Sequence, residues 1–255
     1  MQFIDTHAHL YTEAFDEDRD EMIQRALDAG VGHFFLPAID SSYTPAMKAL
    51  KEAYPDRMSL MAGLHPTHVG QEFEQELKWV ESELRTGSYS AVGEIGIDLY
   101  WDKSLLKEQT VAFRRQIGLA KEFGLPIVIH CRDAFDEIFE VLESEKDDRL
   151  FGIFHCFTGT EAQARHAVSL NMKLGIGGVV TFKNGRIDTF LERIPLGHIV
   201  LETDAPYLAP VPYRGKRNES SYIRCVSRRL AEIYQTSEAE IAAITSANAK
   251  EVFGG

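Results

Sequence analysis

The first apolar run of the chain ends in two histidines, His7 and His9, which are separated by a single alanine. Side chains two positions apart on a β-strand project from the same face, so both imidazoles would point to one place. Two neutral imidazoles aimed together are the start of a divalent-metal site. An H-x-H pair also arises by chance, and paired surface histidines would give the same pattern. The metal-site interpretation is favoured by similar side chains at the ends of later β-rich runs.

Five more side chains of metal-ligand type close later β-rich runs: His65, Glu94, His130, His155 and Asp204. A lone carboxylate in such a place, Glu94 or Asp204, would be partly buried, which is costly unless it is paired or bound to a cation. The set is larger than one tetrahedral ion needs. Four of these five histidines, with the two carboxylates, suit two ions that share a bridging carboxylate.

Two divalent ions about 3.5–4 Å apart can hold a hydroxide between them and stabilise both the attacking and the leaving oxygen. A positioned carboxylate can accept the proton of the water. The chemistry that this constellation predicts is therefore hydrolysis.

The remaining histidines and two of the cysteines have simpler interpretations. His33 and His198 lie at the beginnings of predicted strands, His166 falls within a predicted helix and His68 in a loop, so all four are expected to be structural. Cys131 and Cys156 directly follow His130 and His155, and strand alternation predicts that they turn outward as small packing residues. Asp5 shares the face of His7, where it could orient an imidazole or simply serve as a hydrogen-bonded core residue.

The elements that must position these groups alternate between β-rich and amphipathic helical segments, which predicts a parallel sheet. After the first run, strands are expected at Val31–Ile39, Met58–Leu64, Tyr89–Ile97, Pro126–His130, Leu150–His155, Met172–Val180 and His198–Thr203. Helical segments are expected near residues 17–29, 43–54, 71–85, 104–123, 133–145, 160–170 and 186–194.

Eight such units predict an α/β fold, a closed (β/α)₈ TIM barrel, with extra C-terminal helices at Ser221–Tyr234 and Glu238–Phe253. An open doubly wound sheet is the main alternative, but no G-x-G-x-x-G follows the first strand. No linker or low-complexity tract interrupts the chain, so residues 1–255 are expected to form one domain. In such a barrel the catalytic groups lie at the C-terminal ends of the strands, where the seven candidates stand.

Composition narrows the class of protein further. The net charge of −12 argues against broad electrostatic coating of nucleic acid, although it leaves room for a local site where metal ions supply positive charge. No apolar stretch approaches the roughly 18 residues of a membrane span. Asp5 falls where a signal peptide would be apolar, which argues against such a peptide. Three cysteines without a C-x-x-C suggest reduced thiols. We expect a cytoplasmic protein with no membrane partner.

In order along the chain, several motifs together resemble the TatD-type metal-dependent deoxyribonucleases. They are Asp5–His9, Gly63–Pro66, Val92–Asp98, Ile129–Arg132, His155–Gly159, Glu202–Leu208 and Arg214–Glu219. The resemblance implies that His7, His9, Glu94 and Asp204 hold one ion. It implies that Glu94 bridges to a second ion held by His130 and His155, and that His65 faces the scissile phosphate. Members of the family are described as magnesium- or manganese-dependent nucleases, often acting at a 3′ end of single-stranded DNA.

A basic cluster, Arg214-Gly215-Lys216-Arg217, follows Asp204 in the chain. A solvated basic loop would look the same, but its place near the catalytic rim favours contact with phosphate. Arg132, next to the His130 motif, joins His65 and this cluster among the expected substrate-binding residues.

The predicted function is that of a divalent-metal-dependent deoxyribonuclease, a 3′-5′ exonuclease on single-stranded DNA, with Asp204, Glu94 and His65 as catalytic residues. Magnesium or manganese is expected to support turnover. Imidazole-rich sites favour zinc or another transition ion, which could be retained. A metal-dependent deacylase or amidase on the same barrel is the alternative, because a Lewis acid serves both reactions. A non-catalytic binding barrel is the third hypothesis.

Overall fold

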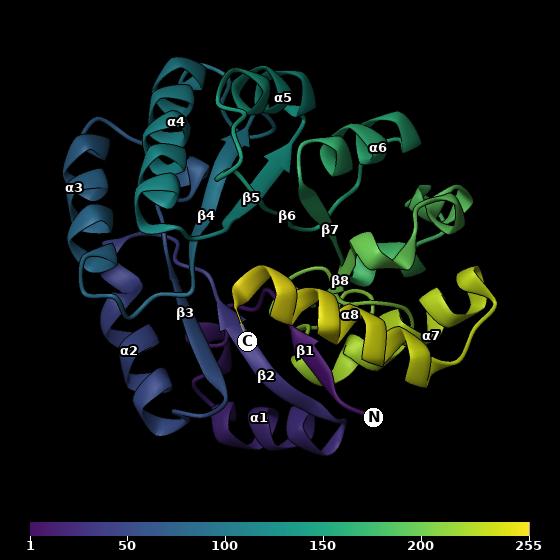
Figure 1. The fold of residues 1–255 in the computed structure, drawn as a ribbon. Coiled ribbons are helices and arrows are strands. Elements are labelled where there is room, and N and C mark those ends of the chain that lie inside the picture. The colour runs from purple at the N-terminus through teal and green to yellow at the C-terminus, as the bar shows by residue number, and fades with distance from the viewer. Residues whose placement is uncertain (255) are drawn as a thin grey trace.

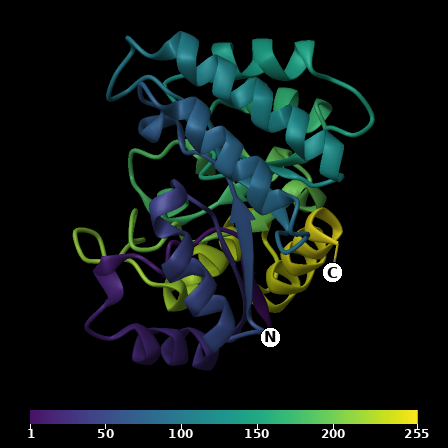
Figure 2. The same cartoon turned by 90° about the vertical axis from the view of Figure 1, so that its left-hand side faces the viewer.

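The computed structural model describes residues 1–254 and shows eight parallel strands in one sheet, hydrogen-bonded in the order β1 to β8. Helices surround this sheet on its outside (Figure 1), and Figure 2 shows α3 and α4 packed side by side there. The strands are β1 (Phe3–Asp5), β2 (Val31–Leu36), β3 (Met58–Ala62), β4 (Ala91–Asp98), β5 (Ile127–Arg132), β6 (Gly152–Phe154), β7 (Met172–Ile176) and β8 (Ile199–Leu201).

The α-helices within residues 1–254 are α1 (Arg19–Asp28), α2 (Thr44–Ala53), α3 (Phe73–Leu84), α4 (Leu106–Phe123), α5 (Phe135–Ser144), α6 (Glu161–Ser169), α7 (Ile223–Tyr234) and α8 (Glu238–Phe253). The predicted (β/α)₈ barrel with two C-terminal helices is therefore confirmed. None of these helices is both long and apolar enough to cross a membrane.

Helix α4 illustrates how the sequence pattern determines an element. Its stripe of Gln109, Phe113, Ile117 and Ala120 is buried, as the helical spacing predicts. Gly124 ends the helix in the left-handed conformation at φ +66°, and its amide donates to the carbonyl of Ala120.

The barrel closes through hydrogen bonds between the chain beyond β1 and the chain around β8. The amide of Thr6 donates to Leu201 O at 3.0 Å, that of Asp204 to His7 O at 2.9 Å, and that of His9 to Ala205 O at 2.7 Å. Strand β1 itself ends at Asp5, so His7 and His9 lie in an extended continuation rather than in the strand. This seam therefore holds three of the expected metal ligands at one mouth of the barrel.

Asp5 strengthens the same seam. Its buried carboxylate accepts hydrogen bonds from the Thr203 amide at 3.0 Å, the Thr203 hydroxyl at 2.6 Å and the Ser220 hydroxyl at 2.6 Å. The idea that Asp5 orients an imidazole is wrong, because its only contact with His7 is a long one, 3.4 Å, to the backbone amide.

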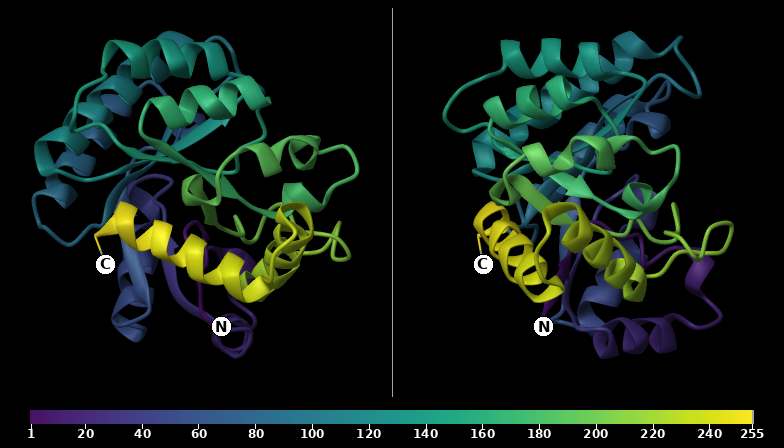
Figure 3. Two further views of the ribbon diagram at one scale, coloured as in Figure 1. Left: turned by 45° about the vertical axis from the view of Figure 1, so that its right-hand side comes forward. Right: turned by 90° about the vertical axis from the view of Figure 1, so that its right-hand side faces the viewer.

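The opposite end of the barrel is filled by apolar side chains. One buried cluster takes a single residue from each of seven strands and adds residues of α8: Ile4, Phe35, Met61, Ala91, Val128, Ile153, Val200, Ala249 and Val252. Phe253 stacks on Phe35 with ring centroids 3.8 Å apart. Helix α8 crosses the barrel at this end (Figures 1 and 3). The polar mouth is thus the one at the C-terminal ends of the strands.

The helix expected at residues 186–194 is replaced by two 3₁₀ turns, η5 (Ile187–Thr189) and η6 (Leu191–Arg193). Arg186 has a positive φ of 59° and Phe190 a φ of −136°, and both lie outside the α-helical region, which interrupts α-helical hydrogen bonding at both ends of η5. Three apolar residues of this segment are still buried: Ile187, Leu191 and Ile194. The apolar spacing thus correctly indicated a buried face, but 3₁₀ turns rather than an α-helix form it. Helix α7 packs against η6 and against α8 (Figure 3).

Gly96 lets β4 and β5 approach closely beside two expected ligands. It adopts φ +144°, and an added Cβ would collide with the backbone carbonyl of His130. We expect Gly96→Ala to lower the free energy of unfolding by about 2–4 kcal/mol in urea denaturation. Gly118→Ala is the matched control, because this helical glycine faces open space and should gain about 0.5–1 kcal/mol. Equal effects of the two substitutions would contradict this account.

Candidate metal centre

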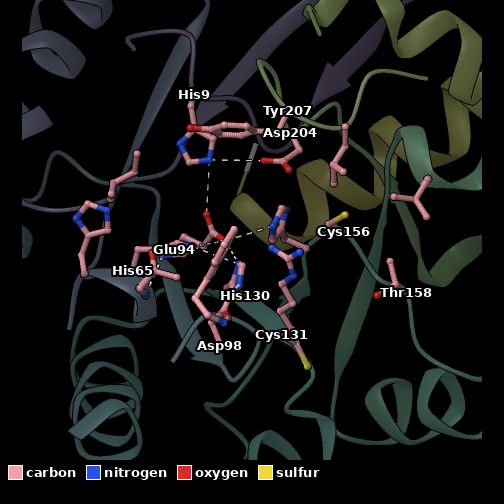
Figure 4. Close-up of a pocket in the computed structure, with 18 residues that line it drawn as sticks. His9, His65, Glu94, Asp98, His130, Cys131, Cys156, Thr158, Asp204 and Tyr207 are labelled. Carbon is pink, nitrogen blue, oxygen red and sulfur yellow. Dashed lines mark hydrogen bonds and ion pairs between the residues drawn. The ribbon is translucent and has the colours of Figure 1, made fainter. Parts of the chain in front are cut away.

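A cavity of about 540 Å³ opens at the C-terminal mouth of the barrel (Figure 4). Its walls include side chains from the ends of β3, β4, β5, β6 and β8 and from the segment after β1. Among them are His9, His65, Glu94, His130, His155 and Asp204. His7 lies fully buried beneath, with its ring stacked on that of His155 at 3.7 Å. The structure thus brings together all seven residues that the strand ends suggested.

Glu94 is the centre of this arrangement. Its Oε2 lies 3.1 Å from Nε2 of His7 and 3.6 Å from Nε2 of His9. Its Oε1 faces the other way, 2.7 Å from Nδ1 of His130 and 3.2 Å from Nε2 of His155. Each oxygen of one carboxylate therefore serves a different group of imidazoles.

Asp204 completes the group around Oε2, because its Oδ1 lies 3.8 Å from Nε2 of His7 and 3.7 Å from Nε2 of His9. Its φ of +57° is a strained conformation for an aspartate, of the kind that concentrates at functional sites. His65 belongs to the group around Oε1, since its Nε2 lies 3.3 Å from that oxygen and 3.2 Å from Nδ1 of His130. His65 is thus close enough to be a ligand as well as to face a phosphate.

The donor atoms fit divalent cations. Within residues 1–254, neither ring nitrogen of His7 makes a hydrogen bond of good geometry, although the ring is fully buried. Three sets of ligand atoms lie within 4.8 Å of one another: His7, His155 and Asp204; His7, His9 and Glu94; and His65, Glu94 and His130. A buried polar atom without a partner is costly, and a cation between these atoms would remove that cost.

Electrostatics support the same interpretation. Burial opposes the ionisation of Glu94, yet the imidazoles of His155, His65 and His7 outweigh it and hold the pKa of Glu94 well below its usual range. Burial, with Glu94 and Glu202 nearby, raises the pKa of Asp204 to about 8. Burial and His7 lower the pKa of His9, which keeps it in the neutral form that binds metal. A divalent cation would favour the charged form of Asp204.

Three residues orient the imidazoles from behind, and the sequence interpretation did not assign them this role. Asp98 Oδ2 lies 2.8 Å from Nε2 of His130, and Glu202 Oε1 lies 3.2 Å from Nδ1 of His155. The Tyr11 hydroxyl, which donates to Pro37 O, lies 2.9 Å from Nδ1 of His9. With a cation bound, each of these ring nitrogens would donate its N–H to the residue behind it, and the other ring nitrogen would be free to bind the cation.

A signal for these residues was present in the sequence. Tyr11 stands two positions after His9, Glu202 two before Asp204, and Asp98 four after Glu94. An even separation along an extended chain places side chains on the same face.

The cysteines differ from their expected orientation, and His68 has the structural contact expected of it but also lines the cavity. Cys131 and Cys156 both line the cavity rather than facing only the helices. Cys156 has a positive φ of 43°, which breaks the strand alternation on which the prediction rested. His68 Nδ1 lies at hydrogen-bond distance from Asp40 Oδ2, 2.6 Å away.

His33 and His166 have the structural contacts expected of them. His33 lies 2.9 Å from the Ser59 hydroxyl, and His166 lies 2.9 Å from Glu143. His198 falls in a 3₁₀ turn just before β8.

The four expected basic contacts differ in their surroundings. Arg132 lines the cavity, and Arg214 stacks on Phe182 with its guanidinium carbon 3.6 Å from the ring centroid. Lys216 is exposed. Arg217 instead donates to Asp18 at 2.7 Å and to Ala14 O at 2.8 Å, which ties its loop to the segment before α1.

Comparison with known proteins agrees with this geometry. The family model described as TatD related DNase matches residues 4–254. The chain belongs to the TatD family. It is 40% identical to the uncharacterised metal-dependent hydrolase YabD of Bacillus subtilis, over 98% of each chain. It is 31% identical to a protein of Yersinia pseudotuberculosis named 3′-5′ ssDNA/RNA exonuclease TatD, again over 98% of each.

The crystal structure of YjjV, a TatD homologue from Escherichia coli, superposes with a TM-score of 0.93 at 31% identity, covering 99% of this chain and 98% of that one. The protein is thus a metal-dependent hydrolase of the TatD family. The names of its relatives do not agree on one substrate, since two of these three relatives are not named as nucleases.

Asp98 offers a test of imidazole orientation that leaves all seven candidate ligands intact. We expect Asp98→Ala to weaken divalent-metal binding about 10- to 100-fold in isothermal titration, because His130 loses the acceptor that fixes its ring. Asp102→Ala removes an exposed carboxylate four residues away, which among residues 1–254 accepts hydrogen bonds only from Ser104, and it should leave the affinity unchanged. Unaltered metal binding in Asp98→Ala would contradict the orienting role.

Proposed function

We propose that this TatD-family hydrolase is a divalent-metal-dependent deoxyribonuclease that removes nucleotides from the 3′ end of single-stranded DNA. The observation that carries the proposal is the orientation of the Glu94 carboxylate, whose two oxygens face two separate groups of imidazoles. Two adjacent ligand groups sharing one carboxylate are typical of hydrolases that use a pair of cations on phosphate esters. The name of the Yersinia relative supports nucleic acid as the substrate.

One cation would be held by His7, His9, Glu94 and Asp204, and a second by Glu94, His130 and His155, with His65 beside it. When bound, the cations would supply Lewis-acid charge and lower the pKa of water. Magnesium or manganese suits turnover on phosphate, while the imidazoles favour retention of zinc or another transition ion.

The chain's own residues have distinct tasks in this reaction. Asp204 borders the cavity and would accept the proton of the attacking water. His65, whose Nδ1 lies 2.7 Å from the Thr67 hydroxyl, would hold its Nε2 toward the phosphate. Arg132, Arg214 and Lys216 would bind phosphate oxygens of the strand. Arg217, expected earlier to join them, is better explained as a support of its loop.

A metal-dependent deacylase or amidase remains the second candidate, since the same ligand groups could polarise a carbonyl. The YabD and YjjV relatives, which are not named as nucleases, are compatible with it. Arg132, a basic side chain that lines the cavity, favours the phosphate substrate.

Glu94→Gln tests the shared carboxylate. Losing its charge should weaken both ligand groups, so metal-dependent cleavage of an end-labelled single-stranded oligonucleotide should fall by several orders of magnitude while the circular dichroism spectrum is unchanged. The assay compares EDTA-treated enzyme with enzyme restored with magnesium, manganese or zinc. Glu52→Gln, at an exposed position of α2, is the control and should retain full activity.

Half of the wild-type activity in Glu94→Gln would rule out the shared role. If the wild type cleaved no oligonucleotide with any metal, yet hydrolysed acyl or amide substrates, the deacylase would replace the nuclease.

Arg214 and Lys216 test the phosphate contacts. The double variant Arg214→Ala/Lys216→Ala should reduce the slope of log KM for a single-stranded oligonucleotide against log salt by about 1.4, because each phosphate contact contributes about 0.7. Arg217→Ala should leave that slope unchanged and instead lower the melting temperature by about 2–4 °C, since its ion pair with Asp18 is lost. The reverse pattern would assign the phosphate contact to Arg217.

A further inference from the structure

Two large aromatic side chains are exposed beside the metal centre without an apparent structural purpose. Tyr100 and Trp101 directly follow β4, and they are 54% and 71% exposed. Trp101 lines the cavity that contains Glu94, and Tyr100 lines a neighbouring cavity of about 490 Å³. Leaving this much aromatic surface in water is unfavourable, and such a patch next to a catalytic cavity marks a binding surface.

The two rings are held in a defined arrangement. Their centroids lie 4.9 Å apart and their planes are nearly perpendicular, at 89°. Asp98 Oδ1 accepts from the amides of Tyr100 at 3.0 Å and Trp101 at 3.3 Å. The other oxygen of the same carboxylate contacts the His130 ring. One carboxylate therefore fixes both a candidate metal ligand and the aromatic pair.

Arg132 adds charge to this aromatic pair. Its guanidinium carbon lies 3.7 Å from the ring centroid of Tyr100 and 5.5 Å from that of Trp101. In residues 1–254 its side-chain contacts are with these rings rather than with a carboxylate, unlike those of Arg217. A guanidinium stacked on a ring keeps its N–H edges available for an anion. Arg132 also lines both cavities, so it stands between them.

We propose that Tyr100, Trp101 and Arg132 form an aromatic platform that binds an unpaired nucleobase next to the phosphate at the metal centre. The inference rests on the proposed nuclease function and specifies the form of its substrate. The exposed face of Trp101 stacks on the base, and Arg132 binds the adjoining phosphate. Every nucleobase has a π-face, so such a platform accepts any sequence. It does not accept a base that remains stacked within a duplex.

Several observations favour a nucleotide over other occupants. The platform adjoins the metal cavity, because two of its three residues, Trp101 and Arg132, also line that cavity. It combines aromatic faces with an unpaired cation, which matches a base joined to a phosphate. The net charge of the chain is −12, so a strand of phosphates needs local contacts of this kind to stay bound.

The first experiment measures binding without cleavage. Trp79 and Trp101 are the two tryptophans of the chain, and Trp79 lies on α3. In Trp79→Phe the emission reports on Trp101, and in the matched variant Trp101→Phe it reports on Trp79. A phosphorothioate thymidine decamer should quench Trp79→Phe and leave Trp101→Phe unchanged. A phosphorothioate decamer of abasic sites, with the same charges, should quench neither variant.

The second experiment measures turnover with the metal-loaded enzyme. Trp101→Ala should raise KM for a single-stranded thymidine oligonucleotide about 5- to 150-fold, the range that one stacked base contributes, with a smaller change in kcat. The same variant should change KM for an abasic oligonucleotide of equal length by less than about twofold. Val111→Ala, at an exposed position of α4, controls for loss of exposed apolar surface.

The outcomes separate this inference from the proposed function. Absent quenching of Trp79→Phe, or an equal rise in KM for the thymidine and abasic substrates, would overturn the platform while leaving the nuclease intact. If the wild type cleaved no oligonucleotide, the proposed function would fail, and the quenching titration would still decide whether the platform binds bases.

Discussion

A buried carboxylate surrounded by imidazoles is the interaction on which the rest of this molecule depends. Glu94 is almost completely buried, and a charge in such a place is tolerated only when its oxygens have partners. Here the partners are nitrogens of His7, His9, His65, His130 and His155, which come from four separate stretches of chain. Because these imidazoles come from four separate stretches, the site requires the barrel to bring the stretches to one mouth. The site therefore forms only when the barrel forms.

The backbone meets this constraint at two places where strands are joined closely. Hydrogen bonds between the segments after β1 and β8 place His7, His9 and Asp204 side by side. Gly96 allows β4 to approach β5, which sets Glu94 against His130. Behind the ligands, Tyr11, Asp98 and Glu202 fix the rings. Positive φ values at Cys156 and Asp204 show where the chain departs from regular strand geometry to aim side chains inward.

The sequence predicted the barrel and the meeting of the seven candidate ligands, because both follow from periodicity that each strand and helix carries locally. What it missed depends on contacts between distant segments. The 3₁₀ turns at 187–193 carry the same apolar spacing as a helix, and only their packing distinguishes the two. The partnership of Arg217 with Asp18 joins residues far apart in sequence, so a basic cluster could not reveal it. Cys156 departs from strand alternation because of its positive φ, which cannot be predicted from its residue type.

For the proposed nucleic-acid substrate, the charge of the chain requires a site that works through short-range contacts. With a net charge of −12, the protein repels a polyanion at long range, so affinity cannot come from a broad basic surface. Cations bound between Glu94 and the imidazoles would supply positive charge where a phosphate lies, and Arg132 adds a local guanidinium. The proposed stacking of a base on Trp101 would involve no net charge and would therefore not be opposed by that repulsion. Asp98 contacts both His130 and the backbone of Tyr100 and Trp101. It would therefore couple the two proposed sources of affinity, because a displaced loop would also turn the ring of a candidate metal ligand.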